Sequence, residues 1–161
     1  MASPNTDLWK KAKDLEFTVQ RESWGTYEVD DDVLVRTRAI LLKLLKIPGE
    51  GGKPPTYVPN AAVLLATDAP FKQRRAPTSP PPGPEQVHAA EKTEAQFRSI
   101  DEPWNEYLYE DDGTQLLRVK LVVSGVSRVT GLYDGFGCPI YQVSHATVVA
   151  PPVPRKVNPG K

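Results

Sequence analysis

The chain has few of the residues that build disulfide frameworks and metal centres. It contains one cysteine, Cys138, and two histidines, His88 and His145, among 161 residues. A single cysteine excludes an internal disulfide and a zinc site made of several cysteines. The two histidines have no neighbouring cysteine or acidic residue at a metal-ligand spacing. We therefore expect no metal and no other cofactor, and we identify no catalytic residue.

Long apolar runs and an excess of charge are also missing. No run approaches the ~20 residues that cross a bilayer, and the N-terminal segment MASPNTDLWKKAKD lacks the apolar core of a signal peptide. The 20 acidic residues balance the 20 basic ones, so the chain has no overall field that attracts nucleic acid or an anionic membrane. We therefore expect a cytoplasmic protein that does not bind membranes.

Proline, by contrast, is abundant. The 17 prolines amount to about twice the average share, and six of them lie between Pro70 and Pro84. The segment Asp68–Pro84 (DAPFKQRRAPTSPPPGP) is therefore predicted to be an extended linker. Its basic residues beside a proline run resemble ligands of adaptor domains with aromatic grooves, although a spacer is the simpler interpretation.

The sequences on the two sides of this linker match each other. The offset is 80 at first, becomes 82 after a short insertion, and then 84 after a second insertion. Matching pairs include Phe17 and Phe97, Glu22 and Glu102, Trp24 and Trp104, Leu34 and Leu116, Arg36 and Arg118, Arg38 and Lys120, and Tyr57 and Tyr141. Because the matches are collinear and the insertions fall at expected turns, we interpret the chain as two divergent copies of one unit of roughly 75 residues.

Each copy is predicted to form three strands. In the second copy these are 106–110, 115–129 and 140–149, where apolar residues alternate from Leu117 to Val123 as in a half-buried strand. Asp112-Gly113 favours a hairpin turn, and Gly125 predicts a bulge. We expect the prolines at 151, 152 and 154 to end the third strand.

The first copy has the same order, with strands at 17–29, 33–47 and 57–66. Its segment Arg38–Lys46 (RAILLKLLK) is rich in residues that favour a helix, whereas the matching Lys120–Arg128 contains valine, serine and glycine, which favour a strand. Since two copies of one unit share a structure, we predict a strand for both segments. A helix at 38–46 would remove the argument for duplication.

A three-stranded meander has one apolar face that it cannot bury alone. We therefore predict a mainly β fold, in which two antiparallel meanders pack as a six-stranded sandwich or small barrel with pseudo-two-fold symmetry. One or two short helices are expected, at Thr6–Leu15 with Asn5 or Thr6 as its N-cap, and at Glu85–Phe97. The predicted division is a first unit at 1–67, a linker at 68–90, a second unit at 91–155 and a tail at 156–161.

Basic and aromatic side chains at matching positions form the candidate binding surface. The cations lie two residues apart on strands, opposite the apolar face, and can bind phosphate, carboxylate or nucleic acid, or simply pair with Glu28 and Glu110 on a solvated face. The aromatic rings can stack on bases or sugars, or fill a core or subunit interface. The candidate residues are Trp24, Tyr27, Arg36, Arg38, Trp104, Tyr107, Tyr109, Arg118 and Lys120.

Neither copy contains a polar constellation typical of catalysis. The acidic turns at 30–32 and 110–112 lack the ligand spacing of a calcium loop, and GEGGK at 49–53 lacks that of a phosphate loop. We therefore expect a non-enzymatic β-rich module that self-associates or docks a protein partner through exposed strand edges and the Trp–Tyr residues. Two alternatives stay open: nucleic-acid binding through the basic strand faces, and binding of a small molecule or carbohydrate between the two copies, with or without catalysis.

Overall fold

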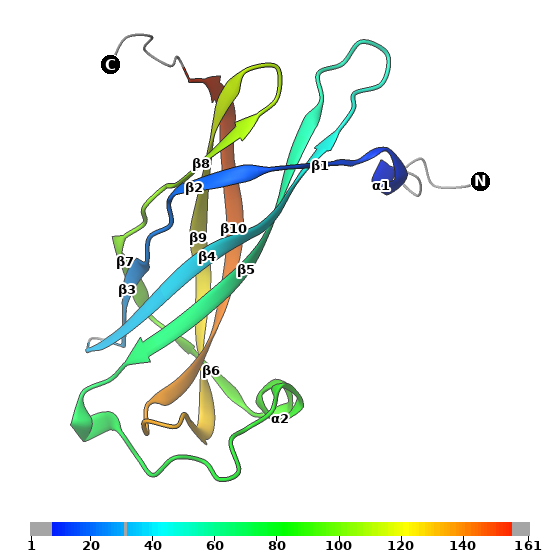
Figure 1. Ribbon diagram of the computed structural model, residues 1–161. Helices are drawn as coiled ribbons and strands as arrows, with labels where there is room; N and C mark the ends of the chain where they lie inside the picture. The colour runs from blue at the N-terminus through cyan, green and yellow to red at the C-terminus, as the bar shows by residue number, and fades with distance from the viewer. Residues whose placement is uncertain (1–7, 31, 156–161) are drawn as a thin grey trace.

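The computed structural model of the chain describes residues 8–30 and 32–155, which form two five-stranded antiparallel sheets (Figure 1). The elements in chain order are α1 (Leu8–Lys11), β1 (Lys13–Leu15), β2 (Phe17–Arg21), β3 (Gly25–Val29), β4 (Val33–Ile47), β5 (Thr56–Asp68), η1 (Phe71–Gln73), α2 (Pro84–Ala89), β6 (Lys92–Ala95), β7 (Phe97–Asp101), β8 (Asn105–Glu110), β9 (Thr114–Tyr133) and β10 (Pro139–Pro154). The mainly β fold is confirmed, whereas the predicted six strands are too few. Within the described residues no helix is long and apolar enough to cross a membrane.

Each sheet is built around one long strand. In the first sheet β4 pairs with β5 along one side and with β3 and β1 along the other, and β3 pairs in turn with β7. In the second sheet β9 pairs with β10, β8 and β6, and β8 pairs with β2. Strands β5 and β10 therefore each have a single partner along their length.

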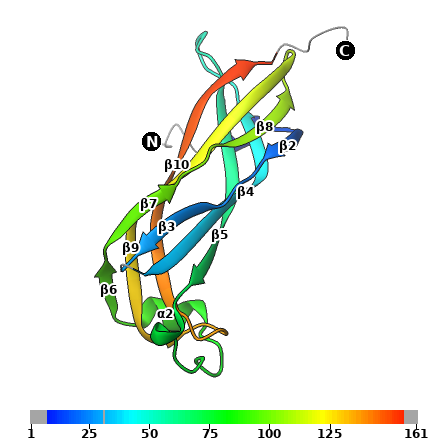
Figure 2. The same ribbon diagram turned by 90° about the vertical axis from the view of Figure 1, so that its left-hand side faces the viewer.

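The two halves of the chain exchange strands. β2 comes from the first half but pairs with β8, and β7 comes from the second half but pairs with β3. Figure 2 shows these four strands on the side that faces the viewer. The prediction of one strand over 17–29 is therefore wrong. The chain changes sheets at 22–24, where the N–H of Ser23 donates to the side-chain Oδ1 of the buried Asn105 (3.0 Å), the first residue of β8.

The leucine-rich segment 38–46 is part of β4, so the predicted strand is confirmed. Side chains at alternate positions from Val33 to Leu41 are buried, and the pattern resumes at Leu44 after a bulge that skips Leu42. Alternating burial against the other sheet outweighs the helix propensity of leucine and lysine.

The second half confirms the predicted alternation and its turn. Leu117, Val119, Leu121 and Val123 are all buried. The pairing of β9 with β10 shifts between Gly125 and Val123 and skips Ser124, so the bulge lies directly beside the glycine predicted to mark it. The predicted hairpin turn leaves three residues, 111–113, between the paired Glu110 and Thr114, and Asp112 and Gly113 have positive φ values of 55° and 103°.

Both predicted helices are shorter than expected, because the residues predicted as their C-terminal ends form strands instead. α1 ends at Lys11, and residues 13–15 join β4 as β1; the predicted caps Asn5 and Thr6 lie outside the described residues. α2 ends at Ala89, and residues 92–95 pair with β9 as β6, which places Ala95 in the core.

The prolines at 151, 152 and 154 do not end the third strand, because β10 runs to Pro154. β10 pairs with β9 only. A proline whose nitrogen faces the unpaired side of β10 therefore breaks no hydrogen bond between strands. The register also shifts between Ala150 and Val153. The predicted tail at 156–161 lies outside the described residues. The linker packs against the β9–β10 turn, where the N–H of Arg75 donates to the carbonyl of Gly137 (3.0 Å).

Two apolar clusters form the core, and each draws on both halves of the chain. One contains Tyr27, Val29, Val33 and Val35 of the first half together with Val123, Val126 and Tyr141 of the second. The other contains Leu15, Leu41 and Leu44 together with Tyr107, Tyr109, Leu117 and Val119. Neither half therefore encloses a core of its own.

Candidate functional site

Trp24 and Trp104 lie on the segments where the chain changes sheets, each beside two cations of the long strand. The guanidinium carbons of Arg36 and Arg38 lie 5.4 and 5.9 Å from the centre of the Trp24 ring. Around Trp104 the matching distances are 5.5 Å for Arg118 and 5.6 Å for Lys120. These distances allow cation–π attraction. The structure thus brings six of the nine candidate residues together, as a Trp24 cluster and a Trp104 cluster.

Each cluster also contains a carboxylate that offsets one of its two cations. Arg38 lies 3.8 Å from Glu22, and Lys120 lies 3.8 Å from Glu102. The sequence match of Glu22 with Glu102 was a usable signal for this role, although we had expected Glu28 and Glu110 as partners. Glu28 instead pairs with Arg98 (2.8 Å), and Glu110 accepts a hydrogen bond from Thr114 (2.6 Å).

The other three candidate residues, Tyr27, Tyr107 and Tyr109, lie in the core and are at most 2% exposed. Tyr27 donates to Glu102 (2.9 Å), and Tyr107 donates to Glu22 (3.0 Å), which also accepts the N–H of Leu41 (3.2 Å). Burial, aided by the bond to Glu102, raises the pKa of Tyr27 to about 12. These tyrosines hold the two halves together and present no surface to a partner.

Asp111, in the turn that follows β8, is the centre of another polar contact between the two halves. Asp111 lies 2.7 Å from the ammonium of Lys46 and accepts a hydrogen bond from Tyr57, whose ring lies 5.5 Å from that of Tyr109. The bonds from Lys46 and then Tyr57 lower the pKa of the Asp111 carboxyl. The network stabilises the ionised form of Asp111 in the folded chain.

Acid should therefore weaken the fold through Asp111. Its pKa is lower in the folded chain, so its stabilisation is complete above the unfolded value of about 3.9 and is lost as the pH falls through the folded value. We expect Asp111→Asn to make the free energy of unfolding less dependent on pH in this acid range, as measured by denaturant unfolding at a series of pH values. Asp112→Asn, in the same turn but exposed, is the control. A wild-type slope in Asp111→Asn would contradict the assignment.

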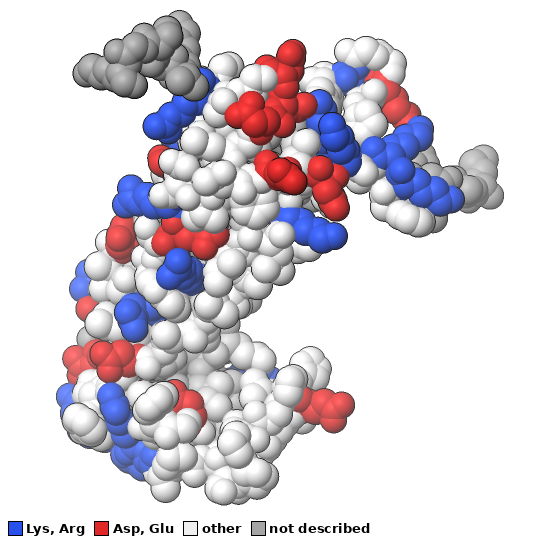
Figure 3. Space-filling model, in the orientation of Figure 1, with Lys and Arg blue, Asp and Glu red and all other residues white. Residues whose placement is uncertain are grey.

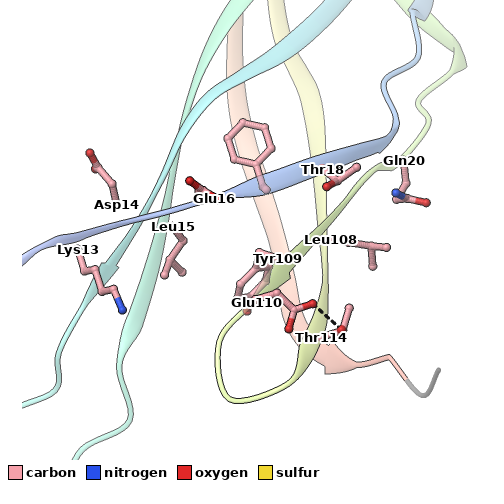
Figure 4. Close-up of a pocket in the computed structure, with 11 residues that line it drawn as sticks. Lys13, Asp14, Leu15, Glu16, Thr18, Gln20, Leu108, Tyr109, Glu110 and Thr114 are labelled. Atoms are coloured by element: carbon pink, nitrogen blue, oxygen red, sulfur yellow. Dashed lines mark hydrogen bonds between the residues drawn. The ribbon is translucent and has the colours of Figure 1, made fainter.

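A cleft of about 530 Å³ opens between β1, β2 and β8 (Figure 4). Its polar lining includes Asp14, Glu16 and Glu110, whose carboxylates do not converge on one point in this view. The hydrogen bond between Thr114 and Glu110 occupies one of these groups. Among the described residues no three His, Cys, Asp or Glu side chains are placed to hold a metal ion.

The free edges of β5 and β10 are the sides of these strands that pair with no other strand. These strands are 13 and 16 residues long, and neither contains lysine, arginine or glutamate; Asp68, the last residue of β5, is the only acid. The opposite edges of the sheets, β2 and β7, have only five residues each, carry charged side chains and are irregular in register. Short, charged and irregular strands are the features that protect edges from further pairing. β5 and β10 are longer and almost uncharged, but parts of them are protected: β5 contains Pro59, β10 contains four prolines, and both pairings include register shifts. The stretches 61–67 and 145–150 contain no lysine, arginine, acidic residue, proline or register shift.

Both edge strands carry exposed apolar side chains. Leu64 and Leu65 of β5 are 45% and 41% exposed, and Val148 and Val149 of β10 are 42% and 37% exposed. Adjacent strand residues point to opposite faces, so each edge is uncovered on both faces. A hollow of about 340 Å³, lined by Leu65, Phe136 and Ile140 among others, lies between the end of β5 and the start of β10. Figure 3 shows a hollowed surface with few charges on the right-hand side of the molecule, which the middle of β5 and of β10 borders in Figure 1 before β5 crosses to the lower left.

Comparison with known proteins adds no family to these observations. The chain matches no protein-family model, no curated protein and no solved structure. A functional assignment therefore depends on the clusters and strand edges described above.

Proposed function

We propose that the protein is a non-enzymatic assembly or protein-binding module, and that the free edges of β5 and β10 are its interaction surface. The observation that carries this proposal is the pair of long edges without lysine, arginine or glutamate, each with two adjacent exposed apolar side chains. An unprotected edge offers backbone N–H and C=O groups that can accept a further strand. Exposed apolar residues on both faces supply area that a partner strand can cover.

The same proposal includes duplication of one unit, with copies within 1–67 and 91–155 joined by the linker at 68–90 and related by a pseudo-two-fold axis. Three features support it. The pairing of β2 with β8 repeats that of β7 with β3 at an offset of 80, so that Phe17 faces Tyr109 as Phe97 faces Val29. The bulges skip Leu42 in β4 and Ser124 in β9, at an offset of 82. The bond from Tyr27 to Glu102 repeats that from Tyr107 to Glu22. Duplication makes the two free edges equivalent.

Site-specific photo-crosslinking tests the interaction surface. A photoreactive residue at Leu65 or Val149 should cross-link to a protein chain, because both side chains are exposed on the edge strands. Val19 and Ile100, which are 49% and 50% exposed on β2 and β7, are matched controls and should give no cross-link. The product should also disappear when Leu64→Lys and Val148→Lys place a charge on each edge. Equal cross-linking from the control positions would contradict the proposal.

Nucleic-acid binding is the second candidate function, favoured by the contact of Trp24 and Trp104 with paired cations. Glu22 and Glu102 leave each cluster with one uncompensated positive charge, so the attraction is weak. The variant Arg36→Ala plus Arg118→Ala should not change the edge cross-links. Retardation of a nucleic acid at low salt that this variant abolishes would favour the second candidate instead.

A further inference from the structure

We propose that the partner of the free edges is a second copy of this chain, joined by strand pairing that continues the sheets across the interface. This inference rests on the proposed function and adds the identity of the partner. β5 pairs with β4 without a register shift over 61–68, and β10 pairs with β9 without a shift over 145–150. Six paired residues span about 20 Å. A strand that fits either edge must be free of charge over this length and apolar on both sides.

The free edges themselves meet these requirements. Residues 61–67 and 145–150 contain no acidic residue, lysine or arginine, and His145 is their one titratable side chain, so two such edges can approach with little like-charge repulsion. The whole chain is also neutral, with 20 acidic and 20 basic residues. Leu64 and Leu65 of one copy can pack against Val148 and Val149 of another. Both pairs are exposed to a similar degree, so each can remove apolar area of the other from water. A partner recognised by opposite charge would find almost nothing to bind on these edges.

Within one molecule, each half of the chain already contributes a strand to the sheet of the other half. β2 extends the sheet of the second half through β8, and β7 extends that of the first half through β3. Strands of different halves therefore pair at two places within one molecule, and both places lie at the sheet edges opposite β5 and β10. Pairing between copies uses the two edges that remain unprotected, and each copy contributes two of them.

Sedimentation velocity of the purified full chain over a wide range of concentration tests this inference. We expect species larger than one chain whose fraction rises with concentration. The variant Leu64→Lys plus Val148→Lys should weaken association by at least about tenfold. The control Val19→Lys plus Ile100→Lys, on β2 and β7, should associate like the wild type.

A charge-swap experiment separates lost pairing from lost folding. Mixing the double lysine variant with Leu64→Glu plus Val148→Glu should restore association, which unfolded chains cannot do. A wild type that remains a single chain at every concentration, or double lysine and glutamate variants that associate as well as the wild type, would overturn the inference. If the purified chain is monomeric but its edges still cross-link to a different protein, the proposed function stands and only the second copy is excluded.

Discussion

Cutting the chain in its linker should leave both halves in one folded particle. A protease site inserted between Pro82 and Gly83 lies where the space around Gly83 is open, so the insertion itself should be tolerated. After cleavage the halves should remain together, because β2 and β7 lie in each other's sheets and both core clusters combine residues of the two halves. Size-exclusion chromatography with light scattering should give the uncut mass, and denaturant should release two fragments.

Each half expressed alone should lack a stable monomeric fold. Without the second half, β3 loses β7 as a neighbour, and Tyr27 loses its hydrogen bond to Glu102. The apolar side chains that the second half covers also become exposed, at a cost of about 25 cal/mol per Å². Co-expression of both halves is the control and should restore the circular dichroism of the intact chain. Two folded, separately eluting halves would contradict the exchange of strands.

Tyr107→Ala should be among the most destabilising single substitutions. Tyr107 is 1% exposed, its ring lies 5.8 Å from that of Phe17 in an edge-to-face contact, and its hydroxyl donates to Glu22. Replacement of a buried aromatic side chain by alanine costs about 3–5 kcal/mol, a large part of the stability of a small protein. Chemical denaturation should show this loss in the free energy of unfolding.

Tyr107→Phe separates the hydrogen bond from the packing. The ring remains, so the expected loss is about 1–3 kcal/mol, from the missing donor to Glu22. The N–H of Leu41 still bonds to Glu22 in this variant, which keeps the loss at the lower end of that range. Losses of equal size for the alanine and phenylalanine variants would mean that the hydroxyl, and not the ring, provides most of the stabilisation.

Much of the strand content was predictable because it follows from local alternation. Leu117 to Val123 alternate in the sequence and are buried in the structure, and the glycine of the β8–β9 turn has the positive φ expected of it. The segment 38–46 required the comparison of the two halves, since its own leucines and lysines favour a helix. Local propensity was insufficient there because burial against the opposite sheet determines the structure.

The exchange of β2 and β7 could not be predicted from the sequence. The residues of β2 match those of β7 at one offset. Each of these strands could therefore pair within its own half or with the other half without any change in the hydrophobic pattern. The same ambiguity placed Tyr27 and Tyr107 among surface candidates, because an alternating strand does not reveal which face another sheet covers. The edge residues Leu64, Leu65, Val148 and Val149 were missed because exposure of an apolar strand depends on its neighbours.

Amide hydrogen exchange on the associated chain tests the central proposal most directly, since paired backbone N–H groups exchange slowly. Compared with the Leu64→Lys plus Val148→Lys variant, the wild type should exchange more slowly within 61–68 and 145–150, two stretches of β5 and β10 that pair without a register shift. The Trp24 and Trp104 clusters should exchange equally in both proteins. Identical exchange at the two edges, or protection confined to the tryptophan clusters, would contradict the proposal that the free edges form the interaction surface.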